Sequence, residues 1–163
     1  MSFQTSHIAT DDKNKFYKLL SQQASGLLSV ENNLIANAAN LSSLLYHSLE
    51  KVNWVGFYLL HNDELVLGPF QGQVACTRIP LGQGVCGTAF SQNKTLRIAD
   101  VHLFKGHIAC DSNSNSELVI PLSIDKKVIG VLDIDSPIQD RFSQEDQDGC
   151  EDIVKIFIQS LKT

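Results

Sequence analysis

Four cysteines are the residues of this chain best suited to covalent chemistry: Cys76, Cys86, Cys110 and Cys150. No two of them form a CxxC pair, so the commonest zinc and dithiol spacings are absent. Cys110 precedes a polar run, residues 111–115 (DSNSN), that predicts an exposed loop and therefore favours a reactive thiol. Cys150 falls within an expected terminal helix, where a cysteine is usually a small buried side chain.

Three carboxylates form a second candidate set. Glu117 opens one expected strand, and Asp133 and Asp135 stand near the end of the next, where side chains two apart point to the same face. Gathered carboxylates suppress one another's ionisation, so one can stay protonated near neutral pH and donate a proton while another binds an ammonium group. From the spacing alone, solvated acids at a strand end are the plainer interpretation.

Trp54 and Tyr58 are four residues apart on an expected strand, so their rings share a face. They could form an aromatic wall against a small molecule, or they could fill the core. The sequence leaves both interpretations open.

We expect no metal in this protein. His102, His107 and Cys110 have spacings of five and three, but no companion motif supplies a fourth zinc ligand. Residues 82–87 (GQGVCG) are not followed by Lys-Ser/Thr, so they predict a turn before a helix rather than a phosphate loop.

The elements that must position these residues follow from the hydrophobic pattern. Helices are expected over residues 12–23, 32–50, 85–92 and from 144 onwards, and strands over 52–60, 64–70, 75–79, 95–98, 117–123 and 127–135. Ser143, with Asp146 three residues on, resembles a capping box before the last helix. Consecutive strands joined by tight turns, with helices to cover a face, predict an α+β domain with an antiparallel sheet.

Composition narrows the class of protein. A chain of 163 residues suits one domain with a substantial core. The net charge is −5 and no basic cluster is present, so neither a nucleic-acid partner nor a membrane surface is expected. The first residues lack the features of a signal peptide, and no apolar run approaches the ~20 residues that span a bilayer. We therefore expect a cytoplasmic protein, whose thiols are held reduced.

Nine short segments, in order from the second helix onwards, together resemble the GAF-domain enzymes that reduce free methionine-(R)-sulfoxide. They are residues 53–58 (NWVGFY), 68–72 (GPFQG), 76–80 (CTRIP), 82–87 (GQGVCG), 100–102 (DVH), 106–111 (GHIACD), 114–117 (SNSE), 120–122 (IPL) and 130–136 (GVLDIDS). The resemblance implies a homodimer of GAF domains, each with a six-stranded antiparallel sheet flanked by helices. The GAF domain would span residues 31–163, after an N-terminal helical extension over residues 1–30.

The resemblance also implies an activity and the residues that carry it. Free L-methionine-(R)-sulfoxide would be reduced to L-methionine through a cysteine sulfenic acid and an intramolecular disulfide, which thioredoxin reopens, without a cofactor. Cys110 would be the attacking thiol, and either Cys76 or Cys86 would resolve the sulfenic acid. Five residues would contact the substrate: Trp54, Tyr58, Glu117, Asp133 and Asp135.

The alternative is a GAF module that binds a small ligand or senses redox state without turnover. Such sensors usually regulate an attached output domain, and a chain of this length leaves no room for one. Three cysteines in the local motifs of the reductases favour the enzyme. Loss of turnover on replacing Cys110 with serine would distinguish the two.

Overall fold

The computed structural model describes residues 5–106, 108 and 112–162. The elements follow the chain in the order α1 (Lys13–Leu28), α2 (Leu34–Ser48), β1 (Trp54–His61), β2 (Glu64–Gly72), β3 (Arg78–Pro80), α3 (Gly84–Gln92), β4 (Leu96–Ile98), the 3-10 helix η1 (Val101–Leu103), β5 (Ser116–Ile124), β6 (Lys127–Ser136) and α4 (Gln144–Ser160). Among the described helices, none combines the length and apolar character needed to cross a bilayer.

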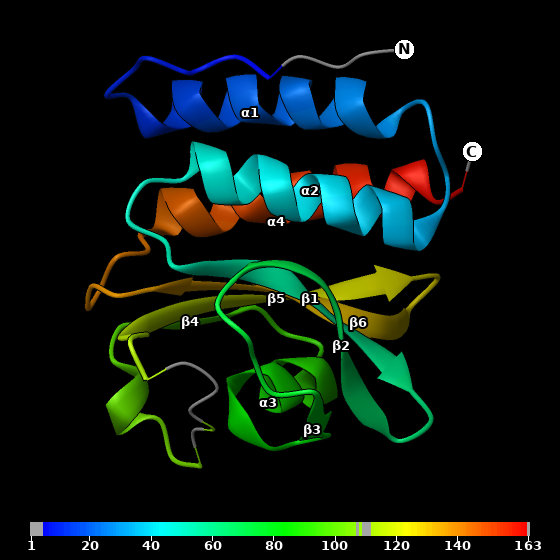
Figure 1. Cartoon of the computed structure of the whole chain (residues 1–163), viewed down its shortest axis with the longest axis vertical. Helices are drawn as coiled ribbons and strands as arrows, with labels where there is room; N and C mark the ends of the chain where they lie inside the picture. The colour runs from blue at the N-terminus through cyan, green and yellow to red at the C-terminus, as the bar shows by residue number, and fades with distance from the viewer. Residues whose placement is uncertain (1–4, 107, 109–111, 163) are drawn as a thin grey trace.

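A six-stranded antiparallel sheet runs through the centre of the molecule, with the strand order β3-β2-β1-β6-β5-β4 (Figure 1). β1 lies between β2 and β6, so that Trp54 pairs with Gly72 on one side and Asp135 on the other. The β5–β6 hairpin turns at Asp125 and Lys126, whose φ angles of 49° and 68° suit the left-handed pair of a type I′ turn. The expected α+β class and six-stranded sheet are confirmed.

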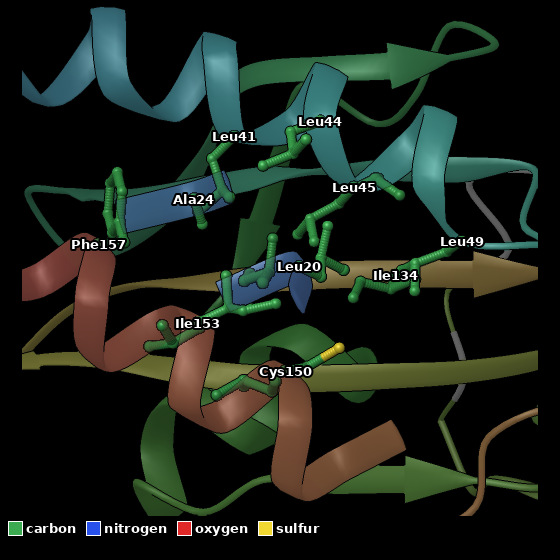
Figure 2. Packing of buried hydrophobic residues seen from close by; sticks show 14 of the residues in the cluster. Leu20, Ala24, Leu41, Leu44, Leu45, Leu49, Ile134, Cys150, Ile153 and Phe157 are labelled. Carbon is green, nitrogen blue, oxygen red and sulfur yellow. The ribbon is translucent and has the colours of Figure 1, made fainter. Parts of the chain in front are cut away.

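The sheet separates two hydrophobic clusters. On one face α2 and α4 pack against the strands, and α1 lies over these two helices on the side away from the sheet (Figure 1). Leu45 of α2 and Phe157 of α4 both belong to this cluster (Figure 2), and the Phe157 ring packs against Phe57 of β1 with centroids 4.9 Å apart. On the other face Trp54 and Tyr58 of the same strand pack with α3. Alternation along β1 therefore serves both clusters, because successive side chains of a strand point to opposite faces.

The capping box at the start of the last helix was predicted correctly. The Ser143 side chain and the Asp146 carboxylate form the expected capping box at the start of α4. α1 begins after Asp12, whose side chain accepts a hydrogen bond from the Lys15 N–H. α1 nevertheless continues to Leu28, past the expected end at residue 23, because its last turns are buried in the helical cluster.

The strand expected at residues 75–79 is shorter and later than predicted. Only Arg78–Pro80 pairs with β2. The prediction is wrong for residues 75–77. The backbone just before β3 bonds to side chains instead of to a neighbouring strand: the carbonyls of Gln73 and Cys76 accept hydrogen bonds from side chains of β1.

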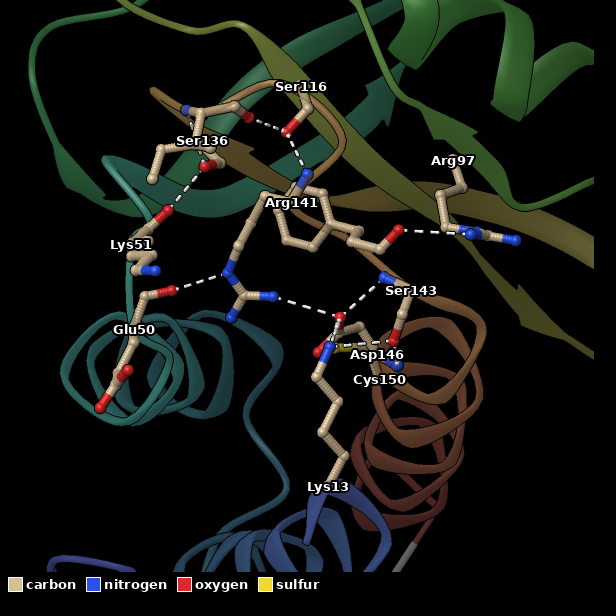
Figure 3. Close-up of polar contacts among 12 residues, drawn as sticks. Lys13, Glu50, Lys51, Arg97, Ser116, Ser136, Arg141, Ser143, Asp146 and Cys150 are labelled. Atoms are coloured by element: carbon tan, nitrogen blue, oxygen red, sulfur yellow. Dashed lines mark hydrogen bonds and ion pairs between the residues drawn. The ribbon is translucent and has the colours of Figure 1, made fainter. Parts of the chain in front are cut away.

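A buried ionic network joins α1 to the start of α4 (Figure 3). Asp146 accepts hydrogen bonds from Lys13 Nζ at 2.6 Å, the Tyr17 hydroxyl at 2.9 Å and Arg141 Nη1 at 3.2 Å. Burial alone would raise the pKa of Asp146, but the bonds from Lys13, the Ser143 N–H and Tyr17 lower it to about 2. The carboxylate therefore stays ionised in the folded protein and ties the two helices together.

Candidate active site

The central strands bring the expected carboxylates to one face of the sheet. β5 and β6 pair so that Glu117 lies opposite Asp135 and Val119 lies opposite Asp133. Glu117 and Asp133 are each only 6% exposed, and Asp135 is half-buried. A solvated strand end, which the spacing alone favours, therefore does not describe Glu117 and Asp133.

Cys86 reaches this carboxyl pair from α3. The helix begins at Gly84 in the left-handed region, with a φ of 61°, which places Cys86 in its first turn. The Cys86 thiol donates a weak hydrogen bond to Glu117 Oε1 over 3.8 Å. Donor atoms of Cys86, Glu117 and Asp133 all lie within 4.8 Å of one another. Asp133 Oδ1 has no hydrogen-bond partner within the described part of the chain.

Burial decides how these groups ionise. It raises the pKa of Glu117 well above the usual range, and the negative charge of Asp133 raises it further. Burial raises the pKa of Asp133 to about 6. It also raises the pKa of the Cys86 thiol, again with a contribution from Asp133. Near neutral pH, Glu117 therefore holds a proton more tightly than Asp133 does, and Cys86 is a neutral thiol.

Three aromatic rings stack on the same face of the sheet. Trp54 stacks on Tyr58 with ring centroids 5.9 Å apart, and on Phe70 with centroids 5.3 Å apart. Gly56 makes this stack possible, because a Cβ there would stand 2.4 Å from Phe70 Cβ and 2.5 Å from Trp54 Cη2. Trp54 and Tyr58 are 2% and 1% exposed, so both rings belong to the core of the second cluster.

Phe70 is a member of this stack that the sequence reasoning missed. It lies on β2 directly opposite Gly56 of β1. The signal that could have revealed it is the hairpin register, which sets a large ring against a residue without a side chain.

The polar ends of the aromatic pair hold the segment that carries Cys76. Trp54 Nε1 donates to the Gln73 carbonyl over 3.1 Å, and the Tyr58 hydroxyl donates to the Cys76 carbonyl over 2.9 Å. Cys76 is half-buried and disulfide-bonded. This segment is thus fixed to the sheet face on which the carboxyl groups lie.

The remaining cysteines differ in their surroundings. Cys86 and Cys150 are buried free thiols. Cys150 lies in the helical cluster, across the sheet from Cys86, and burial raises its pKa to about 12. Its position is that of an inert core residue. Cys110, the expected nucleophile, lies outside the described residues.

The neighbourhood of Cys110 is described in part. Ile108, which precedes it by two residues, packs in the second cluster and lies 3.3 Å from the point where Gly84 would carry a Cβ. His102 is exposed, with Nε2 3.0 Å from Asn115 Oδ1, whereas His107 lies outside the described residues. The group of described residues that could hold a metal ion consists instead of Cys86, Glu117 and Asp133.

Comparison with known proteins places the chain in a family. Residues 22–159 match the GAF domain. The free methionine-R-sulfoxide reductase of Escherichia coli (strain K12) is 53% identical over 143 residues, covering 88% of this chain and 87% of that protein. The chain belongs to the free methionine-R-sulfoxide reductase family of GAF domains.

Two solved structures extend the likeness to three dimensions. The reduced form of the Staphylococcus aureus fRMsr is 53% identical with a TM-score of 0.88, and the match covers 97% of this chain and 99% of that one. The Neisseria meningitidis free methionine-R-sulfoxide reductase, solved with its substrate, is 40% identical with a TM-score of 0.93, covering 97% and 95%. The expected family and the GAF fold are confirmed.

Proposed function

We propose that this protein reduces free L-methionine-(R)-sulfoxide to L-methionine. The observation that carries the proposal is the buried pair Glu117 and Asp133 beside Cys86, on the sheet face that also holds Trp54 and Tyr58. A free amino acid presents an ammonium group for an acidic site and an S-methyl end for an aromatic one. The relative from Escherichia coli bears this activity in its name and aligns along most of the chain, which supports the same substrate here.

The two buried carboxyl groups take different roles in this proposal. Glu117, whose pKa is raised the further, is the proton donor to the sulfoxide oxygen. Asp133 is ionised near neutral pH and binds the α-ammonium group together with Asp135. Trp54 and Tyr58 are covered in this structure, and we propose that they contact the S-methyl end once the substrate displaces part of that cover.

Thiol chemistry completes the reaction. The Cys110 thiolate attacks the sulfoxide sulfur, and the oxygen passes to Cys110 as a sulfenic acid, so the substrate sulfur gains two electrons that Cys110 loses. A second thiol then condenses with the sulfenic acid, which forms a disulfide and releases water. An external dithiol reduces that disulfide and is itself oxidised. These steps balance without a metal or an organic cofactor, and we propose neither for turnover.

Cys76 is the better candidate for the resolving thiol. Cys86 is buried, and both burial and the charge of Asp133 raise its pKa, which disfavours its thiolate. Cys76 is half-buried and already forms a disulfide, which supports it as the partner of Cys110. Cys86 then serves the site as a neutral hydrogen-bond donor to Glu117.

Thioredoxin is the proposed external dithiol, and the proposed enzyme works as a homodimer in the cytoplasm. The dimer is tested by light scattering on the protein as it elutes from a size-exclusion column. A mass near twice 18.0 kDa supports the dimer, and a mass near 18.0 kDa contradicts it.

The deciding experiment follows NADPH consumption with thioredoxin and thioredoxin reductase. Free L-methionine-(R)-sulfoxide, the (S) epimer and a peptide-bound sulfoxide are compared as substrates. We expect turnover on the free (R) epimer alone, its loss in Cys110→Ser, and its retention in the matched variant Cys150→Ser. No turnover on any substrate, with the thiols confirmed reduced, would point instead to a GAF module that only senses a ligand.

A further inference from the structure

Cys86, Glu117 and Asp133 form a compact set of metal-binding donors. Their donor atoms lie within 4.8 Å of one another, and Cys86 Sγ stands 3.8 Å from Glu117 Oε1. In a tetrahedral zinc site, bonds of roughly 2.0–2.3 Å set neighbouring donors roughly 3.3–3.8 Å apart. A sulfur and an oxygen ligand would stand about 3.5 Å apart, a few tenths of an ångström less than the 3.8 Å observed, so small side-chain movements would bring three ligands around one ion.

An unpartnered oxygen marks this set as more than a cluster of acids. Asp133 is 6% exposed, and its Oδ1 accepts no hydrogen bond within the described part of the chain. The charges that act most strongly on Glu117 are those of Asp133 and Asp135, which are also acids. Buried carboxylates need a cation or hydrogen-bond donors, and a dication would neutralise this pair.

We propose that Cys86, Glu117 and Asp133 bind a thiophilic divalent cation, Zn²⁺ or Cd²⁺, with a water molecule as the fourth ligand. A mixed sulfur and oxygen donor set favours these ions over Mg²⁺ and Ca²⁺, which prefer oxygen ligands alone. When the metal binds, the Cys86 thiol and the protonated Glu117 carboxyl both release their protons to solvent, so binding should tighten as pH rises.

Such an ion would act as an inhibitor rather than as a cofactor. It would occupy the carboxylates that bind the substrate's ammonium group and the proton donor, so it should compete with the sulfoxide. This consequence rests on the proposed function, whereas metal binding itself does not.

The test measures binding without turnover. In a Cys76→Ser/Cys110→Ser background, Cys86 and Cys150 are the remaining cysteines. The protein is reduced with a non-chelating phosphine and titrated with Cd²⁺ alone, and the ultraviolet charge-transfer band of a cadmium–thiolate bond is recorded. Calorimetry with Zn²⁺ alone gives the affinity. We expect one equivalent of metal per chain.

Matched variants locate the ion. Cys86→Ser should abolish the cadmium–thiolate band, whereas Cys150→Ser, which changes a buried thiol across the sheet, should keep it. Asp133→Asn should weaken Zn²⁺ binding by at least roughly tenfold. In other metal sites, losing a residue that only hydrogen-bonds to a metal ligand already has an effect of that size. Circular dichroism and a thermal melt establish that each variant is folded.

Two results would overturn the proposal. One is a cadmium–thiolate band that survives in folded Cys86→Ser, and the other is Zn²⁺ affinity that is unchanged in folded Asp133→Asn. Competition is read separately, from the KM of the sulfoxide at increasing Zn²⁺ in the protein with all four cysteines. A protein that binds Zn²⁺ here but never reduces the sulfoxide would refute the proposed function and leave the metal site standing.

Discussion

The Tyr58 hydroxyl donates a hydrogen bond to the backbone carbonyl of Cys76 over 2.9 Å. A buried ring of the central strand therefore positions the segment of a redox candidate that lies eighteen residues further along the chain. Tyr58 thus has a role in positioning Cys76 in addition to its place in the aromatic stack.

Tyr58→Phe should slow the formation of the Cys76 disulfide by about fivefold. The ring and its stacking on Trp54 are kept, and the net stabilisation of one hydrogen bond, about 1 kcal/mol, is lost. The measurement is a single turnover with excess sulfoxide, quenched with an alkylating agent and read by mass spectrometry. Tyr46→Phe, which removes the hydroxyl of a half-buried tyrosine in α2, is the control and should leave the rate unchanged. An equal rate in both variants would show that Tyr58 does not position Cys76.

Gly56→Ala should displace the Trp54 ring. The added Cβ would meet Trp54 Cη2 at 2.5 Å and Phe70 Cβ at 2.4 Å, so the stack must open. We expect a loss of about 1–3 kcal/mol in the free energy of unfolding, as for other overpacked cores, and a higher KM for the sulfoxide. Since the chain has a single tryptophan, near-ultraviolet circular dichroism and fluorescence report on this ring. Unchanged spectra together with an unchanged KM would contradict the positioning role of Gly56.

The elements that could be predicted are those with local signals. The capping box at Ser143 and the turn at Asp125 and Lys126 depend on residues close in sequence, and the structure has both. The end of α1 could not be predicted, because Ala24 and Leu28 are held by burial against other elements. The strand order, which inserts β6 between β1 and β5, likewise depends on pairings between distant residues.

The candidate site was predictable in its parts but not in its assembly. The two-residue strand period places Asp133 and Asp135 on one face without knowledge of the fold. Nothing local indicates that Cys86, thirty-one residues before Glu117, meets that carboxyl group. The burial of Glu117 was also unpredictable, because it depends on how α3 covers the sheet.

Glu117→Gln should lower kcat by about 10²–10⁴-fold, the usual contribution of a general acid. Burial raises the pKa of Glu117, so the protonated form persists to neutral pH, and the activity of the normal protein should fall as pH rises through that raised value. Glutamine has a similar size but no acidic proton to give, so the residual activity should lack this alkaline decline. The readout is the pH dependence of kcat in the thioredoxin-coupled assay.

Asp133→Asn serves as the comparison for Glu117→Gln, since it should act mainly on KM through the lost ammonium contact. A variant of Glu117 that keeps the normal kcat, or that keeps the alkaline decline at the same pH, would assign the proton donor elsewhere.

Relative to the normal protein, Asp133→Asn should be more stable at alkaline pH than at acid pH. Burial raises the pKa of Asp133 from 3.8 to about 6, so the folded state holds this proton more tightly than the unfolded state does. Stability is therefore lost as pH rises through that interval. Between pH 4 and pH 8 the free energy of unfolding of the variant should rise by about 2.4 kcal/mol relative to that of the normal protein, since each pKa unit corresponds to about 1.4 kcal/mol and part of the shift already lies below pH 4. Urea unfolding at the two pH values measures it, and a constant difference would contradict the raised pKa.

Asp146→Asn should destabilise the protein by about 2 kcal/mol, because it removes the buried carboxylate that Lys13 and Arg141 bind and whose pKa lies well below the usual value (Figure 3). The pKa of Asp146 is lowered to about 2, so its contribution is present above the usual carboxyl pKa and is lost as pH falls from about 4 towards 2. Urea unfolding at pH 7 and pH 3 tests both statements, and the deficit of the variant should shrink at the lower pH.

Lys13→Met is the control for Asp146→Asn. The Lys13 side chain is 44% exposed, so its loss should cost only about 1 kcal/mol or less. The network lies on the helical side of the sheet, opposite Cys86, and turnover per folded molecule should therefore be preserved in both variants. If folded Asp146→Asn loses turnover while Lys13→Met keeps it, then a change in the α1–α4 contact reaches the candidate site through the sheet. The helical layer would then influence the site as well as stabilise the fold.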